Sequence, residues 1–244
     1  YFSKNGKPSN IKYKWYEVNE VINCAFNDIF TFKHTRHNNQ LTTHNYKTYA
    51  VKKGKYPQYI DAIQCGFDIE TTKIDENKTF MYCWQFAVYN GDYNVIVGDT
   101  WGDFVLLLDM ITELLAVKNH NIIIWVANLG YEWQFMKHWL NVTNVFFIDT
   151  REPIEIEHNN YILFKECLSW GGSLSKLAND YTNLVKLKGD LDYTKYRETY
   201  KEHDNNEQYY CDFDVLILCQ FAKWFFNQYV INFGIFRNVS IFAQ

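Results

Sequence analysis

Short apolar segments separated by turn residues recur along the chain, and they predict a series of strands. Residues 122–127 are apolar without interruption, which is typical of a strand buried on both faces of a sheet. Two further segments flank Asn90, Gly91 and Asp92, and the Asn-Gly pair predicts a tight hairpin between them. The predicted strands are 11–18, 46–51, 63–69, 80–89, 93–98, 121–127, 145–150, 154–158 and 161–166.

Apolar residues at helical spacing predict four helices. Ser173 is expected to cap the third helix, and Asn205 or Asn206 the fourth, because such side chains accept hydrogen bonds from free backbone N–H groups. Three antiparallel strands lead the series, and strands then alternate with helices, which predicts an α/β fold with a mixed sheet. The predicted helices are 102–117, 131–140, 173–181 and 206–229.

The composition fits a folded protein of a reducing compartment. Hydrophobic residues make up 48% of the 244 residues, enough to bury a sizeable core. The longest apolar run is far too short to span a membrane, and no secretory leader is visible. The six cysteines show neither a CxxC pair nor zinc-ligand spacing. We therefore expect a cytoplasmic protein without disulfides and without membrane contact.

Positive charge is concentrated at the start of the chain. Residues 1–60 contain ten Lys or Arg and three Asp or Glu, although the whole chain has a net charge of −4. With its aromatic residues, this segment is either an arm that lies along a nucleic-acid backbone or an ordinary solvated face. A turn-rich stretch at 52–57 predicts a boundary. The expected organisation is a basic extension or small subdomain at 1–60, a main domain at 61–232 and a tail at 233–244.

The candidate chemistry begins with two carboxylates at the end of a predicted central strand. Asp68 and Glu70 are two residues apart, so their side chains share one face of that strand. Neighbouring carboxylates repel each other, and a divalent cation that prefers oxygen ligands relieves the repulsion. Because the same spacing occurs by chance in surface strands, the pair alone leaves a metal site and plain surface charge as alternatives.

Further acidic residues lie on two predicted helices. Tyr210 and Asp214 are four residues apart and therefore share one helix face, at the polar end of an apolar stripe. Asp212 falls on the opposite side, where we expect a solvated carboxylate. Glu132 opens the helix after the buried strand, where the helix dipole favours a carboxylate even without a function. In α/β folds, functional sites form where strand ends and helix starts meet at one edge of the sheet. We therefore expect four carboxylates to gather at such an edge: Asp68, Glu70, Glu132 and Asp214.

Together these residues resemble the three motifs of the 3′–5′ proofreading exonuclease domain of family B DNA polymerases. The matched positions are Asp68 and Glu70 in the first motif, Asn128, Tyr131 and Glu132 in the second, and Tyr210 and Asp214 in the third. Glu132 stands where the family usually has Asp. The resemblance implies a ribonuclease-H-like α/β fold, with a mixed sheet flanked by helices.

Two further segments are similar to the protein-primed subgroup of bacteriophages and linear plasmids. Residues 187–193 resemble a segment typical of that subgroup, and Lys188 precedes Tyr210 by the subgroup's spacing. Residues 166–168 resemble a strand-end segment that touches single-stranded DNA, with Cys167 where Ser is common. The resemblance covers about residues 63–228.

The resemblance implies a nuclease site that holds two divalent cations, Mg²⁺ or Mn²⁺. Asp68 would bridge both ions, Glu70 and Asp214 would complete the ligands of one, and Glu132 would support the other. Tyr210 would orient the attacking water. The implied substrate is the 3′ end of single-stranded DNA, and the implied product is a deoxynucleoside 5′-monophosphate.

The resemblance also implies how the DNA strand is held. The ring of Tyr131 offers a face on which an unpaired base stacks. Lys188 would offset phosphate charge during cleavage, and it counts among the catalytic residues for that reason. The implied nucleic-acid-binding residues are Thr71, Asn128, Tyr131, Leu168 and Lys188.

The chain lacks the polymerase-domain motifs of the family, Asp-x2-Ser-Leu-Tyr-Pro and Tyr-x-Asp-Thr-Asp. We therefore do not expect it to synthesise DNA by itself. It is either the exonuclease part of a larger polymerase, with a terminal protein as a further partner, or a free-standing exonuclease of DNA or RNA. A third alternative is a catalytically weak module that binds nucleic acid or docks on a partner.

Overall fold

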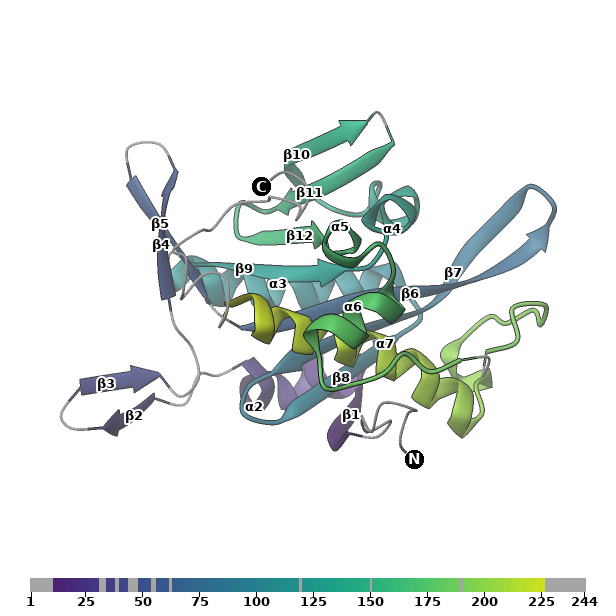
Figure 1. The fold of residues 1–244 in the computed structure, drawn as a ribbon, viewed down its shortest axis with the longest axis horizontal. Coiled ribbons are helices and arrows are strands. Elements are labelled where there is room, and N and C mark those ends of the chain that lie inside the picture. Colours follow the sequence, from purple (N-terminus) through teal and green to yellow (C-terminus); the bar gives the residue numbers. More distant parts are fainter. Residues whose placement is uncertain are drawn as a thin grey trace.

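A long mixed sheet runs through the molecule and carries helices on both of its faces (Figure 1). The computed structural model describes residues 11–30, 34–37, 40–43, 48–53, 56–61, 63–118, 120–149, 151–188 and 191–226. The predicted tail at 233–244 lies outside these residues.

Eight strands follow one another across this sheet. Their order is β1 (Tyr13–Glu17), β8 (Tyr93–Gly98), β7 (Lys78–Tyr89), β6 (Gln64–Asp75), β9 (His120–Val126), β12 (Ile162–Glu166), β11 (Glu152–His158) and β10 (Val142–Asp149). β6, β7 and β8 form an antiparallel meander, whereas β9 lies parallel to both β6 and β12. The prediction of leading antiparallel strands followed by strand–helix alternation in an α/β fold is confirmed.

Part of the predicted N-terminal extension belongs to the main sheet. β1 pairs in parallel with β8 at one edge. β4 (Thr48–Lys53) and β5 (Tyr56–Asp61) form a hairpin, and β5 also pairs with the start of β9. β2 (His34–His37) and β3 (Gln40–Thr43) form a separate two-stranded sheet. The division of the chain near residue 60 stays a prediction.

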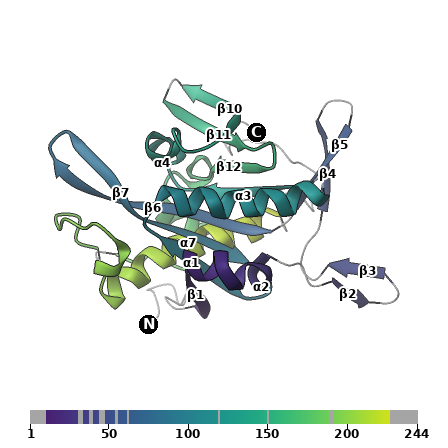
Figure 2. The same cartoon turned by 180° about the vertical axis from the view of Figure 1, so that it is seen from behind.

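A layer of helices covers each face of the sheet (Figure 2). One face carries α3 (Trp101–Lys118), α1 (Val18–Glu20), the π-helical turn η1 (Val21–Ala25) and α2 (Phe26–Phe30). The other face carries α7 (Asn205–Trp224), α6 (Leu174–Tyr181) and α5 (Leu168–Gly171). The remaining helices are α4 (Leu129–Met136), which packs against β11 and β12, and the 3-10 turn η2 (Tyr200–Glu202). Within the described part of the chain, no helix has the length and apolar character needed to cross a membrane.

Each face of the sheet has its own apolar core. On the α3 face, the rings of Phe67 and Phe104 stack with centroids 4.5 Å apart. On the α7 face, Trp125 meets Phe221 edge to face at 5.0 Å. β9 supplies side chains to both cores, so the prediction of a strand buried on both faces is confirmed.

Two sequence-based expectations about α7 were wrong. Its N-cap is Asp204, whose carboxylate accepts from the N–H groups of Asn206 and Glu207, so neither predicted asparagine has that role. Asp212 is not solvated but 1% exposed. It accepts hydrogen bonds from the Tyr13 hydroxyl at 2.8 Å and the Gln208 amide at 2.7 Å. The physical reason is that β1 joins the sheet beside α7 and covers the helix face that the sequence left open. Ser173 caps α6 as predicted.

The close approach of α7 to β6 depends on one glycine. A Cβ atom at Gly66 would lie 2.6 Å from Leu218 Cβ and 2.7 Å from the Val215 carbonyl oxygen, both on α7. Because alternate residues share a strand face, Asp68 and Glu70 follow Gly66 on the side that α7 covers. The missing side chain at Gly66 therefore sets how closely α7 approaches these carboxylates.

We expect Gly66→Ala to lower the free energy of unfolding by about 1–3 kcal/mol, because the added methyl forces α7 away from β6. Gly102→Ala is the matched control. Its new Cβ meets only Thr100 Oγ1 at 3.9 Å, and alanine favours the helix, so we expect equal or slightly higher stability. Denaturant unfolding of both variants measures the difference. Equal stability of the two variants would contradict the close approach.

Candidate active site

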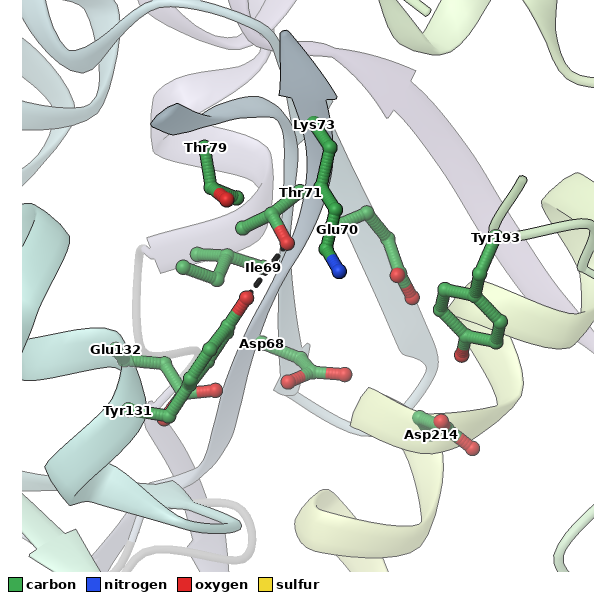
Figure 3. Close-up of a pocket in the computed structure, with 10 residues that line it drawn as sticks. All are labelled: Asp68, Ile69, Glu70, Thr71, Lys73, Thr79, Tyr131, Glu132, Tyr193 and Asp214. Carbon is green, nitrogen blue, oxygen red and sulfur yellow. Dashed lines mark hydrogen bonds between the residues drawn. The ribbon is translucent and has the colours of Figure 1, made fainter. Parts of the chain in front are cut away.

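Four carboxylates from three elements line one open pocket of about 500 Å³. β6 contributes Asp68 and Glu70, the first turn of α4 contributes Glu132, and α7 contributes Asp214. Figure 3 shows Asp68 between Glu132 on one side and Glu70 and Asp214 on the other. The residues lining the pocket are Asp68, Ile69, Glu70, Thr71, Lys73, Thr79, Tyr131, Glu132, Tyr193 and Asp214. The expected gathering of the four carboxylates is therefore what the structure shows.

Three of the four carboxylates are buried, and burial together with mutual repulsion disfavours their charged forms. Glu70, Glu132 and Asp214 are 3–5% exposed. Burial, with the charge of Asp214, raises the pKa of Asp68 to about 7, and Lys186 opposes the effect. Burial raises the pKa of Asp214 to about 6, again against Lys186. Burial and the charge of Asp68 raise the pKa values of Glu70 and Glu132 well above their usual range. The site therefore favours positive charge or protons beside its carboxylates.

The position of Glu132 follows from the turn that links β9 to α4. Asn128 adopts a left-handed conformation, with φ of 67°, and the helix begins at the next residue. The Glu166 carboxylate accepts hydrogen bonds from the backbone N–H groups of Leu129 and Leu168, each at 2.6 Å, and of Asn128 at 3.3 Å. The end of β12 is thereby tied to the start of α4. Glu132 lies three residues after Leu129, in the first turn of α4, and its side chain reaches the pocket from there.

Asp214 has a cationic partner in the segment between α6 and α7. The Lys186 ammonium forms an ion pair with Asp214 Oδ2 and lies 3.7 Å from the centre of the Tyr210 ring. Tyr210 is buried behind the pocket, and its hydroxyl is 3.5 Å from that of Tyr193, which lines the pocket. Tyr210 and Asp214 therefore share one helix face, as their spacing predicts.

The oxygen donors of the pocket fit hard divalent cations by their chemistry. Glu132 Oε2 and Asp214 Oδ1 are buried without a hydrogen-bond partner. An unsatisfied buried acceptor costs about 1–3 kcal/mol, and a cation would satisfy it. Among the described residues, no three His, Cys, Asp or Glu side chains are grouped closely enough to hold one ion as they stand. Side-chain rotation is therefore needed to bring three donors onto one ion.

The mouth of the pocket offers an aromatic surface. Tyr131 is 40% exposed, and its hydroxyl and Thr71 Oγ1 are 2.6 Å apart across the pocket. Figure 3 shows this contact, with Lys73 on the same strand beyond Thr71. The exposed ring of Tyr193 faces the pocket from the opposite side. The pocket thus lies between two tyrosines that a flexible polymer can reach.

Three expected substrate residues do not line the pocket. Asn128 and Lys188 are exposed, and Leu168 packs against the α7-side core. Their roles toward DNA stay predictions. Lys188 belongs to a segment without regular structure, which is why a count of residues could not place its side chain.

Sequence reasoning missed four residues that the structure brings to the site. Tyr193 ends the segment 187–193 that resembles the protein-primed subgroup, so that resemblance could have identified it as a candidate site residue. Lys73 and Thr79 lie where β6 and β7 continue beyond their predicted ends. The pairing of the two strands shifts register between Glu70 and Thr71, so the alternation that places Asp68 and Glu70 does not extend to Lys73. No sequence pattern pointed to Lys186.

The fold is similar to part of a DNA polymerase of known structure. No family model matches the chain, and no curated protein gives a significant match. The structure is similar to phi29 DNA polymerase, a protein-primed family B polymerase. The complex of that enzyme with single-stranded DNA has a TM-score of 0.53 and 17% identity, covering 72% of this chain and 32% of the polymerase.

Two other structures of that polymerase agree with this comparison. The ternary complex with primer-template DNA and incoming nucleotides has a TM-score of 0.53 at 16% identity, and it covers 72% of this chain and 32% of the polymerase. An orthorhombic crystal form has a TM-score of 0.52 at 17% identity, and it covers 69% and 31%. This chain thus matches less than a third of the polymerase's length. At this level of identity, the comparison establishes a shared fold for the matched part of the polymerase and nothing further.

Proposed function

We propose that this chain is a 3′–5′ exonuclease module that removes nucleotides from single-stranded DNA with the help of two divalent cations. The observation that carries the proposal is the convergence of Asp68, Glu70, Glu132 and Asp214 in one open pocket beside an exposed tyrosine. The shared fold with a DNA polymerase that has been solved with single-stranded DNA supports it. The meander followed by parallel strands supports the ribonuclease-H-like fold that the motifs imply.

The four carboxylates divide between two cation positions in this proposal. Asp68 lies between the others, so it would help to hold both Mg²⁺ or Mn²⁺ ions. Glu70 and Asp214 would hold one of them together with Asp68, and Glu132 would support the other. Such ions would supply charge stabilisation for the attacking and leaving oxygens of an in-line displacement.

The remaining side chains hold the substrate. The Tyr131 ring receives the terminal base, while the Thr71 hydroxyl fixes the Tyr131 hydroxyl. Tyr210 is buried beside Asp214, in a position from which we propose that it orients the attacking water. Lys188 is exposed in the segment after Lys186, and we propose that it neutralises phosphate charge.

In this proposal the chain is the proofreading part of a larger protein-primed DNA polymerase. The polymerase domain and a terminal protein are then its partners. The fold shared with part of a protein-primed DNA polymerase supports this reading. The alternatives are a free-standing exonuclease of DNA or RNA and a module that binds nucleic acid without cleaving it. The experiment below separates cleavage from binding alone, and DNA from RNA as the substrate.

We expect this chain to shorten a 5′-labelled single-stranded DNA oligonucleotide from its 3′ end in the presence of Mg²⁺ or Mn²⁺. EDTA removes the cations, and Asp68→Ala/Glu70→Ala removes two of their ligands, so either change should abolish the ladder of products. Asp75→Ala/Glu76→Ala removes two exposed carboxylates at the tip of the same hairpin and should retain the activity. Gel analysis of the labelled products measures the outcome.

Other outcomes of this experiment identify the alternatives. DNA that is bound by the wild-type chain but stays intact rules out the nuclease and favours the binding module. Faster shortening of an RNA oligonucleotide favours a free-standing exonuclease of RNA.

We expect Tyr131→Ala to raise the KM for single-stranded DNA roughly 5- to 150-fold, because stacking of a base on an aromatic ring contributes about 1–3 kcal/mol. Tyr131→Phe keeps the ring and loses only the hydrogen bond to Thr71, so its KM should stay within about threefold of wild type. Steady-state digestion of one oligonucleotide by the three proteins measures the effect. Equal damage in both variants would show that the hydroxyl contact, rather than the ring, holds the substrate.

A further inference from the structure

Lys186 holds a position that none of the motifs assigns. It lies in the segment between α6 and α7, where its neighbours Leu184 and Leu187 are packed into the apolar core. These two leucines fix the backbone on either side of the lysine. The Lys186 side chain is 16% exposed, and its ammonium is directed at Asp214. The lysine is therefore anchored at the site rather than free to sample solvent.

The ammonium is held from two sides. Asp214 Oδ2 is its ion-pair partner, and the Tyr210 ring lies 3.7 Å from the Nζ atom, within the range of a cation–π contact. Both partners lie on α7, one turn apart. The charge of Lys186 also lowers the pKa values of Asp68 and Glu70, against the larger effect of burial. Lys186 therefore supplies positive charge to Asp68 and Glu70 as well as to Asp214.

This ion pair has a consequence for any divalent cation at the same place. Asp214 Oδ2 already carries the ammonium, and its other oxygen has no partner. A divalent ion at Asp214 would lie within a few ångströms of the ammonium, in a largely buried site where charges are screened less than in water. The ion must therefore overcome the repulsion or displace the lysine from the carboxylate.

We propose that Lys186 competes with divalent cations for Asp214 and so weakens their binding to the site, an inference that rests on the proposed two-cation nuclease. Lys186 is then a positioning residue that acts through Asp214. It keeps the acidic cluster from repelling itself apart when few divalent ions are present. It also sets the ion concentration at which the site fills.

The test is the dissociation constant for Mn²⁺, measured by titration calorimetry on the full chain after treatment with EDTA and without DNA. Lys186→Met keeps an unbranched apolar stem of similar length and removes the charge. We expect it to bind Mn²⁺ at least about tenfold more tightly than wild type. Lys186→Arg keeps the charge and should bind within about threefold of wild type. Lys176→Met removes an exposed lysine on α6 and should leave the binding unchanged.

Thermal unfolding gives a second readout that does not depend on calorimetry. In EDTA, Lys186→Met should unfold at a lower temperature than wild type, because the carboxylates lose their counter-charge. Added Mn²⁺ should raise its unfolding temperature by more than it raises that of wild type. The rise in unfolding temperature on adding Mn²⁺ would be larger even for a variant that folds only with Mn²⁺. The test therefore also applies if Lys186→Met is only marginally stable.

The failures of the two proposals are distinguishable. Equal or weaker Mn²⁺ binding by Lys186→Met, with clear binding by wild type, overturns the competition and leaves the nuclease proposal intact. A lysine with a purely structural role would produce this result, since its loss would loosen the site. Absence of Mn²⁺ binding and of any Mn²⁺-dependent thermal shift in every protein overturns the cation site itself, and the competition with it.

Discussion

The contact between α7 and β6 is the constraint on which the rest of the site depends. Gly66 lets the helix lie against the strand with the Leu218 Cβ and the Val215 carbonyl in the space that a side chain would fill. Because the helix is this close, Asp214, which lies one turn before Leu218, reaches Asp68 and Glu70 on the strand. A single position without a side chain thus joins two acidic elements that are about 150 residues apart in sequence.

The same contact creates an electrostatic cost. Packing the acidic end of β6 under α7 buries Glu70 and Asp214 and raises their pKa values. The charged forms of these carboxylates are therefore disfavoured at the place where the carboxylates lie together. A protein selected only for stability would replace these residues, and functional sites are where such a cost is retained. The unpartnered oxygens of Glu132 and Asp214 point to the same explanation, because ordinary buried acceptors find a donor.

Local periodicity was enough to predict which functional residues share a face, but not what covers that face. The two-residue spacing of Asp68 and Glu70 and the four-residue spacing of Tyr210 and Asp214 are properties of single elements, and both predictions hold. Asp212 was misplaced because its burial depends on Tyr13, about 200 residues away, on a strand that joins the sheet edge. Lys186 escaped notice for the same reason, since only the packed segment before α7 brings it to Asp214.

The two lysines of that segment differ in environment, and this difference bears on how motif spacing transfers between proteins. Spacing from Tyr210 assigns the phosphate-binding role to Lys188, whereas the structure pairs Lys186 with Asp214 and leaves Lys188 exposed. In a helix, a shift of two residues would turn a side chain to another face, but this segment has no regular period, so spacing alone does not fix direction. An exposed lysine can follow a mobile phosphate, while a buried ion-paired one must first give up its partner. In the proposed nuclease, the two positions would therefore serve different tasks, Lys188 toward the DNA strand and Lys186 toward the cations.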